Sequence, residues 1–171
     1  MDKIRDLIRD VPDFPKKGII FKDICPVLQD PEAFHEVVDT LVDRYKDHHI
    51  DAIVGMESRG FIFGAPLALR MDIPFVLVRK EGKLPAETMK IDYSLEYGEA
   101  TIEMHKDALE PGDRVLVVDD LLATGGTAAA TVKLIEQAGA EVVKCAFFIE
   151  LGFLKGRDKL PEGKVDSLIT Y

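Results

Sequence analysis

The sequence predicts an α/β domain with a central, mostly parallel sheet flanked by helices. Four short apolar runs lack polar alternation, as strands do when both faces of a parallel sheet are covered. Segments with helical spacing of apolar residues separate these runs, and this alternation favours a parallel sheet. Polar or glycine-rich residues follow the runs, so these loops should converge at one edge of the sheet. The runs are 51–56, 75–78, 115–118 and 142–149.

Size and composition indicate one ordinary globular domain spanning residues 1–171. The formal net charge is −9, which argues against non-specific binding to nucleic acid or to an anionic membrane. No apolar run reaches the length of a membrane span. Cys25 and Cys145 are the two cysteines, and we interpret them as reduced, buried residues of a cytosolic protein. We therefore expect a cytoplasmic protein with neither nucleic-acid nor membrane partners.

The amino-terminal third should contain two helices with an extended segment between them. Helical spacing from Ile4 to Val11 predicts a short helix, which the prolines that follow would end. Residues 18–24 indicate a short strand or extended loop. Asp30 and Pro31 are typical of a helix start, with aspartate as the N-cap. The apolar face that follows, up to residue 45, should pack in the core.

The middle of the chain places cations after two predicted strands. Arg59 follows the strand 51–56 and precedes a predicted helix over 61–70, in which Pro66 either causes a kink or lies near the start. Arg79, Lys80 and Lys83 follow the strand 75–78. In an acidic protein these cations favour a polyphosphate contact, although a surface salt bridge or a solvated loop is the simpler alternative. Residues 84–98 predict a long loop, which would be a functional lid.

In the last third, a strand is expected over 100–104 and another over 165–170. Between them, the strand 115–118 is followed by an alanine-rich helix over 128–138. Residues 150–160 indicate a loop with a short basic helix.

The stretch from Val115 to Thr127 carries the main chemical signal. Residues 123–127 form a small-residue loop between a strand and a helix start, which is suited to binding phosphate on backbone N–H groups. Carboxylates repel phosphate, so Asp119 and Asp120 should contact sugar hydroxyls or a divalent metal of the same ligand. The alternative is an ordinary surface turn. The glycine-rich motifs of nucleotide triphosphatases and dinucleotide-binding enzymes are absent from the sequence.

This stretch resembles the binding motif of the type I phosphoribosyltransferases for 5-phosphoribosyl-1-pyrophosphate (PRPP). The resemblance extends along nearly the whole chain and is strongest to the members that act on adenine. Its other segments are 12–15, 18–26, 57–64, 79–85 and 93–98. Lys22 and Glu57 stand where arginine and aspartate are common in the family, and neither change removes a charge.

The resemblance implies the type I phosphoribosyltransferase fold with a small hood and a flexible catalytic loop. The hood would consist mainly of about residues 1–30 plus the carboxyl-terminal segment. The implied reaction joins adenine to PRPP, with Mg²⁺ as cofactor, giving AMP and pyrophosphate as part of purine salvage. The Mg²⁺ would be held mainly through substrate oxygens, without a firm protein ligand. A homodimer is also implied, with some basic residues reaching the neighbouring site.

The resemblance also implies roles for individual residues. Phe21 would stack on adenine, with Ile20 and Lys22 beside it, and the Glu57–Ser58 peptide bond is often cis in the family. Asp119 and Asp120 would bind the ribose, while Glu96 would handle the proton of the base. The implied 5′-phosphate loop is Ala123, Thr124, Gly125, Gly126 and Thr127, and the implied pyrophosphate ligands are Ser58, Arg59, Arg79, Lys80 and Lys83.

The chemistry of these residue types fits the reaction. Cleavage at the anomeric carbon builds positive charge on the sugar and negative charge on pyrophosphate, which Arg59 and Lys83 would stabilise. Two alternatives remain at this point. The acceptor could be another purine, hypoxanthine or xanthine, or the chain could be a non-catalytic PRPP-sensing regulator. A regulator would normally carry a nucleic-acid-binding surface, and the net charge of −9 argues against one.

Overall fold

The computed structural model describes residues 1–94 and 98–171. The chain divides into two compact units, Met1–Asp43 and Arg44–Tyr171. Among the described residues, no helix has the length and apolar character needed to cross a membrane.

The first unit contains short helices and a two-stranded antiparallel sheet. Its helices are α1 (Asp2–Leu7), α2 (Cys25–Gln29) and α3 (Pro31–Tyr45), of which the last ends in the second unit. Strand β1 (Arg9–Pro12) pairs with β2 (Ile20–Asp23). The predicted N-cap is confirmed, because Oδ1 of Asp30 accepts hydrogen bonds from the N–H groups of Glu32 and Ala33 at 3.0 and 3.2 Å.

The second unit is built on a sheet of seven strands in the order β5-β6-β4-β3-β7-β8-β9. Strands β4, β3, β7, β8 and β9 run parallel to one another, whereas β6 pairs antiparallel with both β4 and β5. The expected mostly parallel sheet is therefore confirmed. The strands are β3 (Ala52–Met56), β4 (Phe75–Lys80), β5 (Thr88–Ser94), β6 (Glu99–His105), β7 (Arg114–Leu122), β8 (Glu141–Glu150) and β9 (Val165–Thr170).

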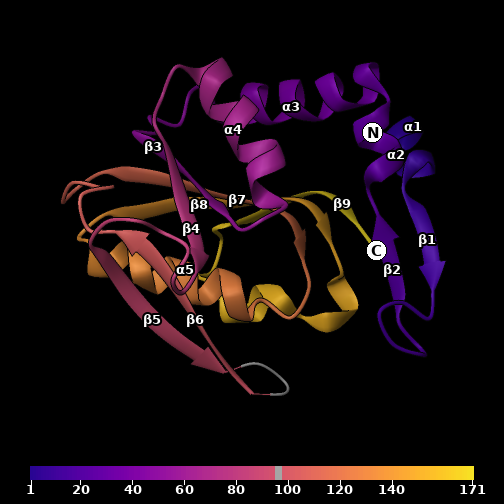
Figure 1. Cartoon of the computed structure of the whole chain (residues 1–171). Coiled ribbons are helices and arrows are strands. Elements are labelled where there is room, and N and C mark those ends of the chain that lie inside the picture. The colour runs from indigo at the N-terminus through magenta and orange to yellow at the C-terminus, as the bar shows by residue number, and fades with distance from the viewer. Residues whose placement is uncertain (95–97) are drawn as a thin grey trace. The chain divides into compact units, whose positions relative to one another are not determined.

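Helices α4 (Gly60–Met71) and α5 (Gly126–Gln137) cover opposite faces of this sheet (Figure 1). On the α4 face, the ring of Phe63 contacts that of Phe148 with 5.2 Å between centroids. On the α5 face, Leu134 and Ile135 are buried against inward-facing side chains of β3, β7 and β8. The central strands are buried on both faces, which explains why their sequences are continuous apolar runs. The short helices η1 (Gly152–Leu154) and η2 (Gly156–Lys159) connect β8 to β9.

The prediction of a long loop over residues 84–98 is wrong between Thr88 and Ser94. Residues Thr88–Ser94 form β5, which pairs along β6 as an antiparallel hairpin (Figure 1). The reason is a period of two: Met89, Ile91 and Tyr93 pack against the core, while the residues between them are more polar. Glu96 lies outside the described residues.

Three smaller expectations also need correction. Val11 is not in the first helix but in β1, where it pairs with Phe21. Pro66 does not lie near the start of α4 but in the middle of the helix, and the alternative of a kink stays a prediction. Cys25 is exposed rather than buried, since it begins the short helix α2, whereas Cys145 is buried in β8.

Two predicted strands are longer than their apolar runs. Arg79 and Lys80 belong to β4, and they pair with Glu103 and Ile102 of β6. Likewise, β7 continues through Asp119 and Asp120 to Leu122, because pairing with β8 persists to its end. The sequence predicted that these charged residues follow the strands, whereas they belong to them.

Candidate active site

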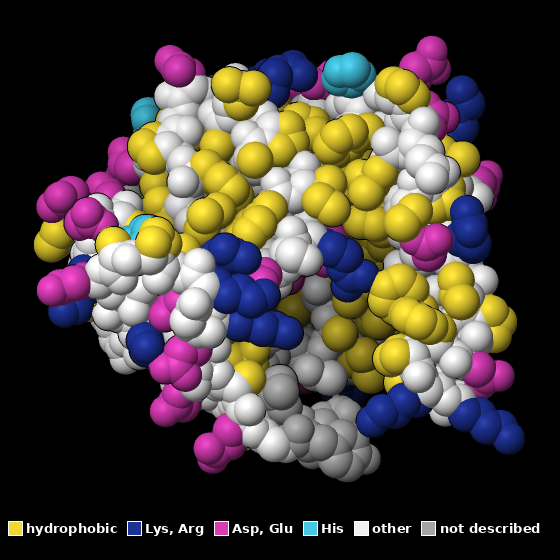
Figure 2. All heavy atoms as spheres, viewed as in Figure 1, with side chains coloured by type: hydrophobic (Ala, Val, Ile, Leu, Met, Phe, Trp, Pro, Cys, Tyr) yellow, Lys and Arg dark blue, Asp and Glu magenta, His cyan; other side chains and the backbone are white. Residues whose placement is uncertain are grey.

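Two cavities of the second unit contain most of the side chains singled out from the sequence. The first, the pyrophosphate cavity, has a volume of about 550 Å³ and is lined by Glu57, Ser58, Arg59, Lys80, Lys83, Asp119, Asp120, Leu121 and Ala123. The second, the phosphate cavity, has a volume of about 440 Å³ and is lined by Ser94, Asp119, Leu121–Ala128, Phe147, Leu154 and Lys159. Asp119, Leu121 and Ala123 line both cavities, so the two are adjacent. On the face in Figure 2, several Lys and Arg side chains gather near the middle of the view.

The end of β7 explains why the cavities open at this place. Its pairing with β3 ends at Val118, whereas its pairing with β8 continues to Leu122. Beyond β3 the chain turns through Glu57 and Ser58 into α4, and the peptide bond between these two residues is cis, as the resemblance implied. The backbone from Asp119 onward is therefore flanked by loop residues rather than by a second strand on that side.

The acidic pair, Asp119 and Asp120, lies where the two cavities meet, and its carboxyl groups have little contact with water. Burial raises the pKa of Asp119 well above its usual value, and the charge of Asp120 raises it further. The side chain of Asp120 is 4% exposed, and Nε of Arg59 lies 2.9 Å from its Oδ2. Burial also raises the pKa of Asp120, although the Arg59 charge opposes this shift. Such a pair is suited to binding hydroxyl donors or a cation.

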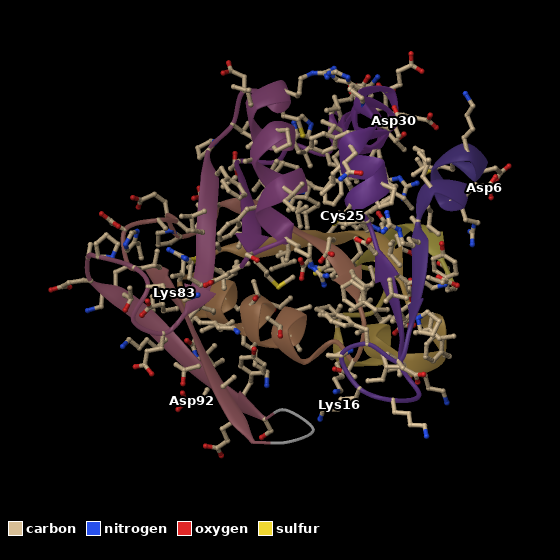
Figure 3. The ribbon with its side chains drawn as sticks, turned by 45° about the vertical axis from the view of Figure 1, so that its right-hand side comes forward. Asp6, Lys16, Cys25, Asp30, Lys83 and Asp92 are labelled. Atoms are coloured by element: carbon tan, nitrogen blue, oxygen red, sulfur yellow. The ribbon has the colours of Figure 1, made fainter. Side chains whose placement is uncertain are left out.

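Glu57 organises the cations of the pyrophosphate cavity. Its carboxylate accepts hydrogen bonds from Nζ of Lys83, from Nε of Arg79 at 3.4 Å and from the N–H of Lys80 at 2.9 Å. Burial acts to raise the pKa of Glu57, but the bond from Lys83 and the other donors outweigh it and lower the pKa. Figure 3 shows Lys83 near the end of β4. Glu57 therefore holds these cations together at the edge of the cavity.

The phosphate loop ends at the amino end of α5, as expected. Gly125 is the residue before the helix, and its φ of 78° is a conformation that glycine adopts without strain. The N–H groups of the first helical turn and the hydroxyls of Thr124 and Thr127 are available as neutral donors for an anion. The hydroxyls of Tyr93 and Thr127 lie 3.1 Å apart, so strand β5 contacts this loop.

The donor set agrees with a Mg²⁺ held mainly by substrate oxygens. Among the described residues, no group of three or more acidic, His or Cys side chains is arranged to hold a metal. Asp119 and Asp120 nevertheless place two carboxylates at one strand end beside Arg59, and burial is the main cause of their raised pKa values. Mg²⁺ commonly binds one or two carboxylates together with substrate phosphates, so the residues fit this metal.

Most of the predicted site residues in the second unit line one of the two cavities. Arg79 and the predicted adenine-binding residues do not. Arg79 lines neither cavity; its guanidinium contacts Glu57 and donates from Nη1 to the carbonyl of Lys83 at 3.2 Å. The predicted adenine-binding residues belong to the first unit, where the rings of Phe14 and Phe21 lie 5.2 Å apart and Nζ of Lys22 lies 2.6 Å from Oδ1 of Asp10. Their role in binding stays a prediction, as does that of Glu96.

Sequence reasoning missed several residues that line the cavities, and three of them are instructive. Leu121 lines both cavities but is an ordinary strand residue in sequence. In the sequence, Glu57 was noted only as standing where aspartate is common in the family. Its partners Arg79, Lys80 and Lys83 lie on or just after a different strand, so their contact was not foreseen. Lys159 lines the phosphate cavity; the short basic helix expected over residues 150–160 was the signal that pointed to it.

Comparisons with known proteins agree with this geometry. The family model "Phosphoribosyl transferase domain" matches residues 27–169. An adenine phosphoribosyltransferase of Anaeromyxobacter dehalogenans is 57% identical over 100% of this chain and 99% of that protein. The crystal structure of the adenine phosphoribosyltransferase from Thermoanaerobacter pseudethanolicus aligns with a TM-score of 0.96 at 52% identity, covering 99% of each chain. That from Saccharomyces cerevisiae, complexed with an imino-altritol bisphosphate and adenine, aligns with a TM-score of 0.92 at 43% identity, covering 98% of this chain and 97% of that one.

The fold and the paired cavities thus define a phosphoribosyltransferase domain. The chain belongs to the type I phosphoribosyltransferase family and, within it, to the adenine phosphoribosyltransferases.

Proposed function

We propose that the chain transfers the 5-phosphoribosyl group from PRPP to adenine, giving AMP and pyrophosphate in purine salvage. The observation that carries this proposal is the position of Asp119, which lines both the pyrophosphate cavity and the phosphate cavity. PRPP has a ribose between a pyrophosphate and a 5′-phosphate. A carboxylate between a cation-lined cavity and a phosphate loop matches that order of chemical groups.

In this proposal, the pyrophosphate cavity binds and stabilises the leaving group. The bond between the anomeric carbon and pyrophosphate breaks and its electron pair leaves with pyrophosphate, while a ring nitrogen of adenine forms the new bond to that carbon and loses its proton. Arg59 and Lys83 balance the resulting negative charge, with Ser58 and Lys80 as further contacts and Arg79 acting through Glu57. Asp119 and Asp120 orient the ribose hydroxyls and offset positive charge on the ring. A bound Mg²⁺ would supply charge neutralisation on pyrophosphate, and Asp119 and Asp120 are the candidate protein ligands.

The rest of the proposal concerns the base and the surroundings of the site. Ile20, Phe21 and Lys22 contact adenine as part of a hood formed by about residues 1–30 and the carboxyl-terminal segment. Glu96 handles the proton of the base. The protein acts in the cytoplasm as a homodimer, as the resemblance implies.

One assay tests the proposal directly. Purified protein is mixed with PRPP, Mg²⁺ and one purine at a time, and the nucleotide formed is measured. We expect AMP from adenine, and at most trace product from hypoxanthine, guanine or xanthine. A 6-oxopurine used as readily as adenine would contradict the choice of base, while an absence of every nucleotide product would contradict the transferase activity itself.

A further inference from the structure

The phosphate cavity contains a cation that the proposed site residues leave out. Among the described residues, Lys159 is the one Lys, Arg or His that lines this cavity. The other lining cations, Arg59, Lys80 and Lys83, belong to the pyrophosphate cavity. Lys159 is the last residue of η2 and follows the phosphate loop by more than 30 positions in sequence.

Direct backbone contact fixes η2 against the phosphate loop. Gly156, the first residue of η2, is buried, and a Cβ atom added there would lie 2.2 Å from the carbonyl oxygen of Ala123. A Cβ atom added to Gly125 would lie 2.3 Å from the carbonyl oxygen of Gly156. No side chain fits between the two segments. Their separation is therefore set by backbone contact, which side-chain rotation cannot change.

An ion pair anchors η2 to the sheet on its other side. Arg157 donates from Nε and Nη2 to the two carboxylate oxygens of Glu150, at 2.7 and 2.6 Å. Glu150 is 2% exposed at the end of β8, and the hydroxyl of Ser167 on β9 also donates to it at 2.8 Å. A two-pronged bond of this kind holds a guanidinium in one orientation. Because Lys159 lies two residues beyond Arg157, its backbone is held at the rim of the cavity.

The charge of the cavity indicates what Lys159 contacts. The side chain of Lys159 makes no hydrogen bond or ion pair with any residue that the structure describes. Asp119 is the acidic residue lining the same cavity. The loop and the α5 terminus offer neutral donors, so without Lys159 the ionisable lining would be negative. A sugar 5′-phosphate carries close to two negative charges at neutral pH, and a nearby ammonium would balance part of that charge.

We infer that Lys159 is a further ligand of the 5′-phosphate, in PRPP and in AMP, and that Gly156 and Arg157 hold it in place. This inference rests on the proposed function. Nζ of Lys159 donates to a phosphate oxygen that the α5 amides and threonine hydroxyls also bind. The pyrophosphate end of PRPP is bound by other cations and does not require Lys159.

The test compares Lys159→Gln with Lys159→Arg and with Lys155→Gln. Lys155 is an exposed lysine that lies between η1 and η2 and lines neither cavity, so it controls for loss of one positive charge nearby. Binding of AMP and of pyrophosphate is measured by calorimetry at two salt concentrations. For Lys159→Gln we expect AMP affinity to fall about tenfold, as for the loss of one charged contact, with less salt dependence and unchanged pyrophosphate affinity. Lys159→Arg should retain most of the AMP affinity, and Lys155→Gln all of it.

Three outcomes would overturn the inference. Equal AMP affinity in wild type and Lys159→Gln would show that Lys159 does not contact the phosphate. An equal loss for AMP and pyrophosphate, or the same loss in Lys155→Gln, would show a general effect of charge. If the wild type bound neither AMP nor PRPP, the proposed function would fail together with this inference, whereas the first two outcomes leave the function standing.

Discussion

At the scale of single residues, the acidic pair is proposed to bind the ligand, but its burial lowers the stability of the fold. A carboxyl group whose pKa is raised in the folded chain binds protons more tightly there than in the unfolded chain. Ionised Asp119 therefore destabilises the fold, and increasingly so as pH rises above its ordinary pKa. The N–H of Asp120 and the Arg59 charge favour the ionised form, but burial and the charge of Asp120 outweigh them, so we infer that the group is retained for binding.

We predict that Asp119→Asn lowers turnover sharply without lowering the melting temperature. Asparagine retains the oxygen that accepts the N–H of Asp120 at 2.8 Å and removes the buried charge. Asp120→Asn should also lower turnover, but it removes the charge that pairs with Arg59 at 2.9 Å and should lower the melting temperature. Steady-state rates at saturating PRPP and thermal melts at pH 7 check both variants. Wild-type rates in both would exclude a role in binding the ribose.

Arg59 provides the matching prediction on the cationic side. Arg59→Ala should weaken pyrophosphate binding about tenfold to a hundredfold, because a hydrogen bond to a charged group contributes roughly 1.5–3 kcal/mol. Arg70→Ala is the control, since Arg70 lies in the last turn of α4 and lines neither cavity. Product inhibition by pyrophosphate is the measurement. Unchanged inhibition would mean that Arg59 serves Asp120 alone.

At the scale of elements, the hairpin β5–β6 depends on one buried carboxylate. Glu103 is 2% exposed and accepts hydrogen bonds from the N–H groups of Lys83 and Leu84, at 3.0 and 2.9 Å, and from the Thr88 hydroxyl at 3.2 Å. Burial acts to raise the pKa of Glu103, but these donors outweigh it and lower the pKa. The turn that carries Lys83 is thus tied to β6 by Glu103.

We predict that Glu103→Gln loosens this turn, so that trypsin cuts after Lys83 or Lys90 faster than in wild type. Because the pKa of Glu103 is lowered in the folded chain, its ionised form stabilises the turn above the ordinary carboxyl pKa. That stabilisation is lost as pH falls through the lowered value. Wild-type stability should therefore fall toward acid pH more steeply than that of Glu103→Gln. Equal cleavage rates in both proteins would contradict the role of Glu103, and bound PRPP with Mg²⁺ should slow cleavage in each.

The sequence predicted the elements on which the site is built better than the contacts between them. Continuous apolar runs identified β3, β4, β7 and β8, and small residues after β7 identified the phosphate loop. The role of Glu57 was not predictable, because it depends on the register that brings β3 beside β4. The hairpin was missed although Met89, Ile91 and Tyr93 alternate, since the intervening residues and Pro85 resemble a loop. Lys159 reaches its cavity only through the packing of η2.

At the scale of the whole molecule, the proposed ligands are divided between the two compact units. The residues proposed for PRPP belong to Arg44–Tyr171, and those proposed for adenine belong to Met1–Asp43. Substitutions in the first unit should therefore change the use of the base more than the binding of PRPP.

We predict that Phe21→Ala weakens adenine binding without admitting hypoxanthine. Stacking contributes roughly 1–3 kcal/mol per base and does not distinguish purines. Hydrogen bonds to the edge of the base can reject an analogue by roughly 10⁴-fold, and we expect backbone groups near Ile20 and Lys22 to provide them. The measurement is competition between adenine and hypoxanthine in both proteins, with the Michaelis constant for PRPP as the control. Gain of hypoxanthine use in the variant would show that the ring itself selects the base.

The pairing of β3 with β7 also has a consequence for how the site arises during folding. Ala52 pairs with Val115, and the loop carrying Arg59 reaches the acidic pair only through this contact between distant parts of the chain. Closing so long a loop costs entropy before any contact repays it. The phosphate loop and α5 are adjacent in sequence and can form locally. The pyrophosphate cavity can form only after β3 and β7 have paired. A nascent chain therefore forms its phosphate loop before it can bind both ends of its substrate.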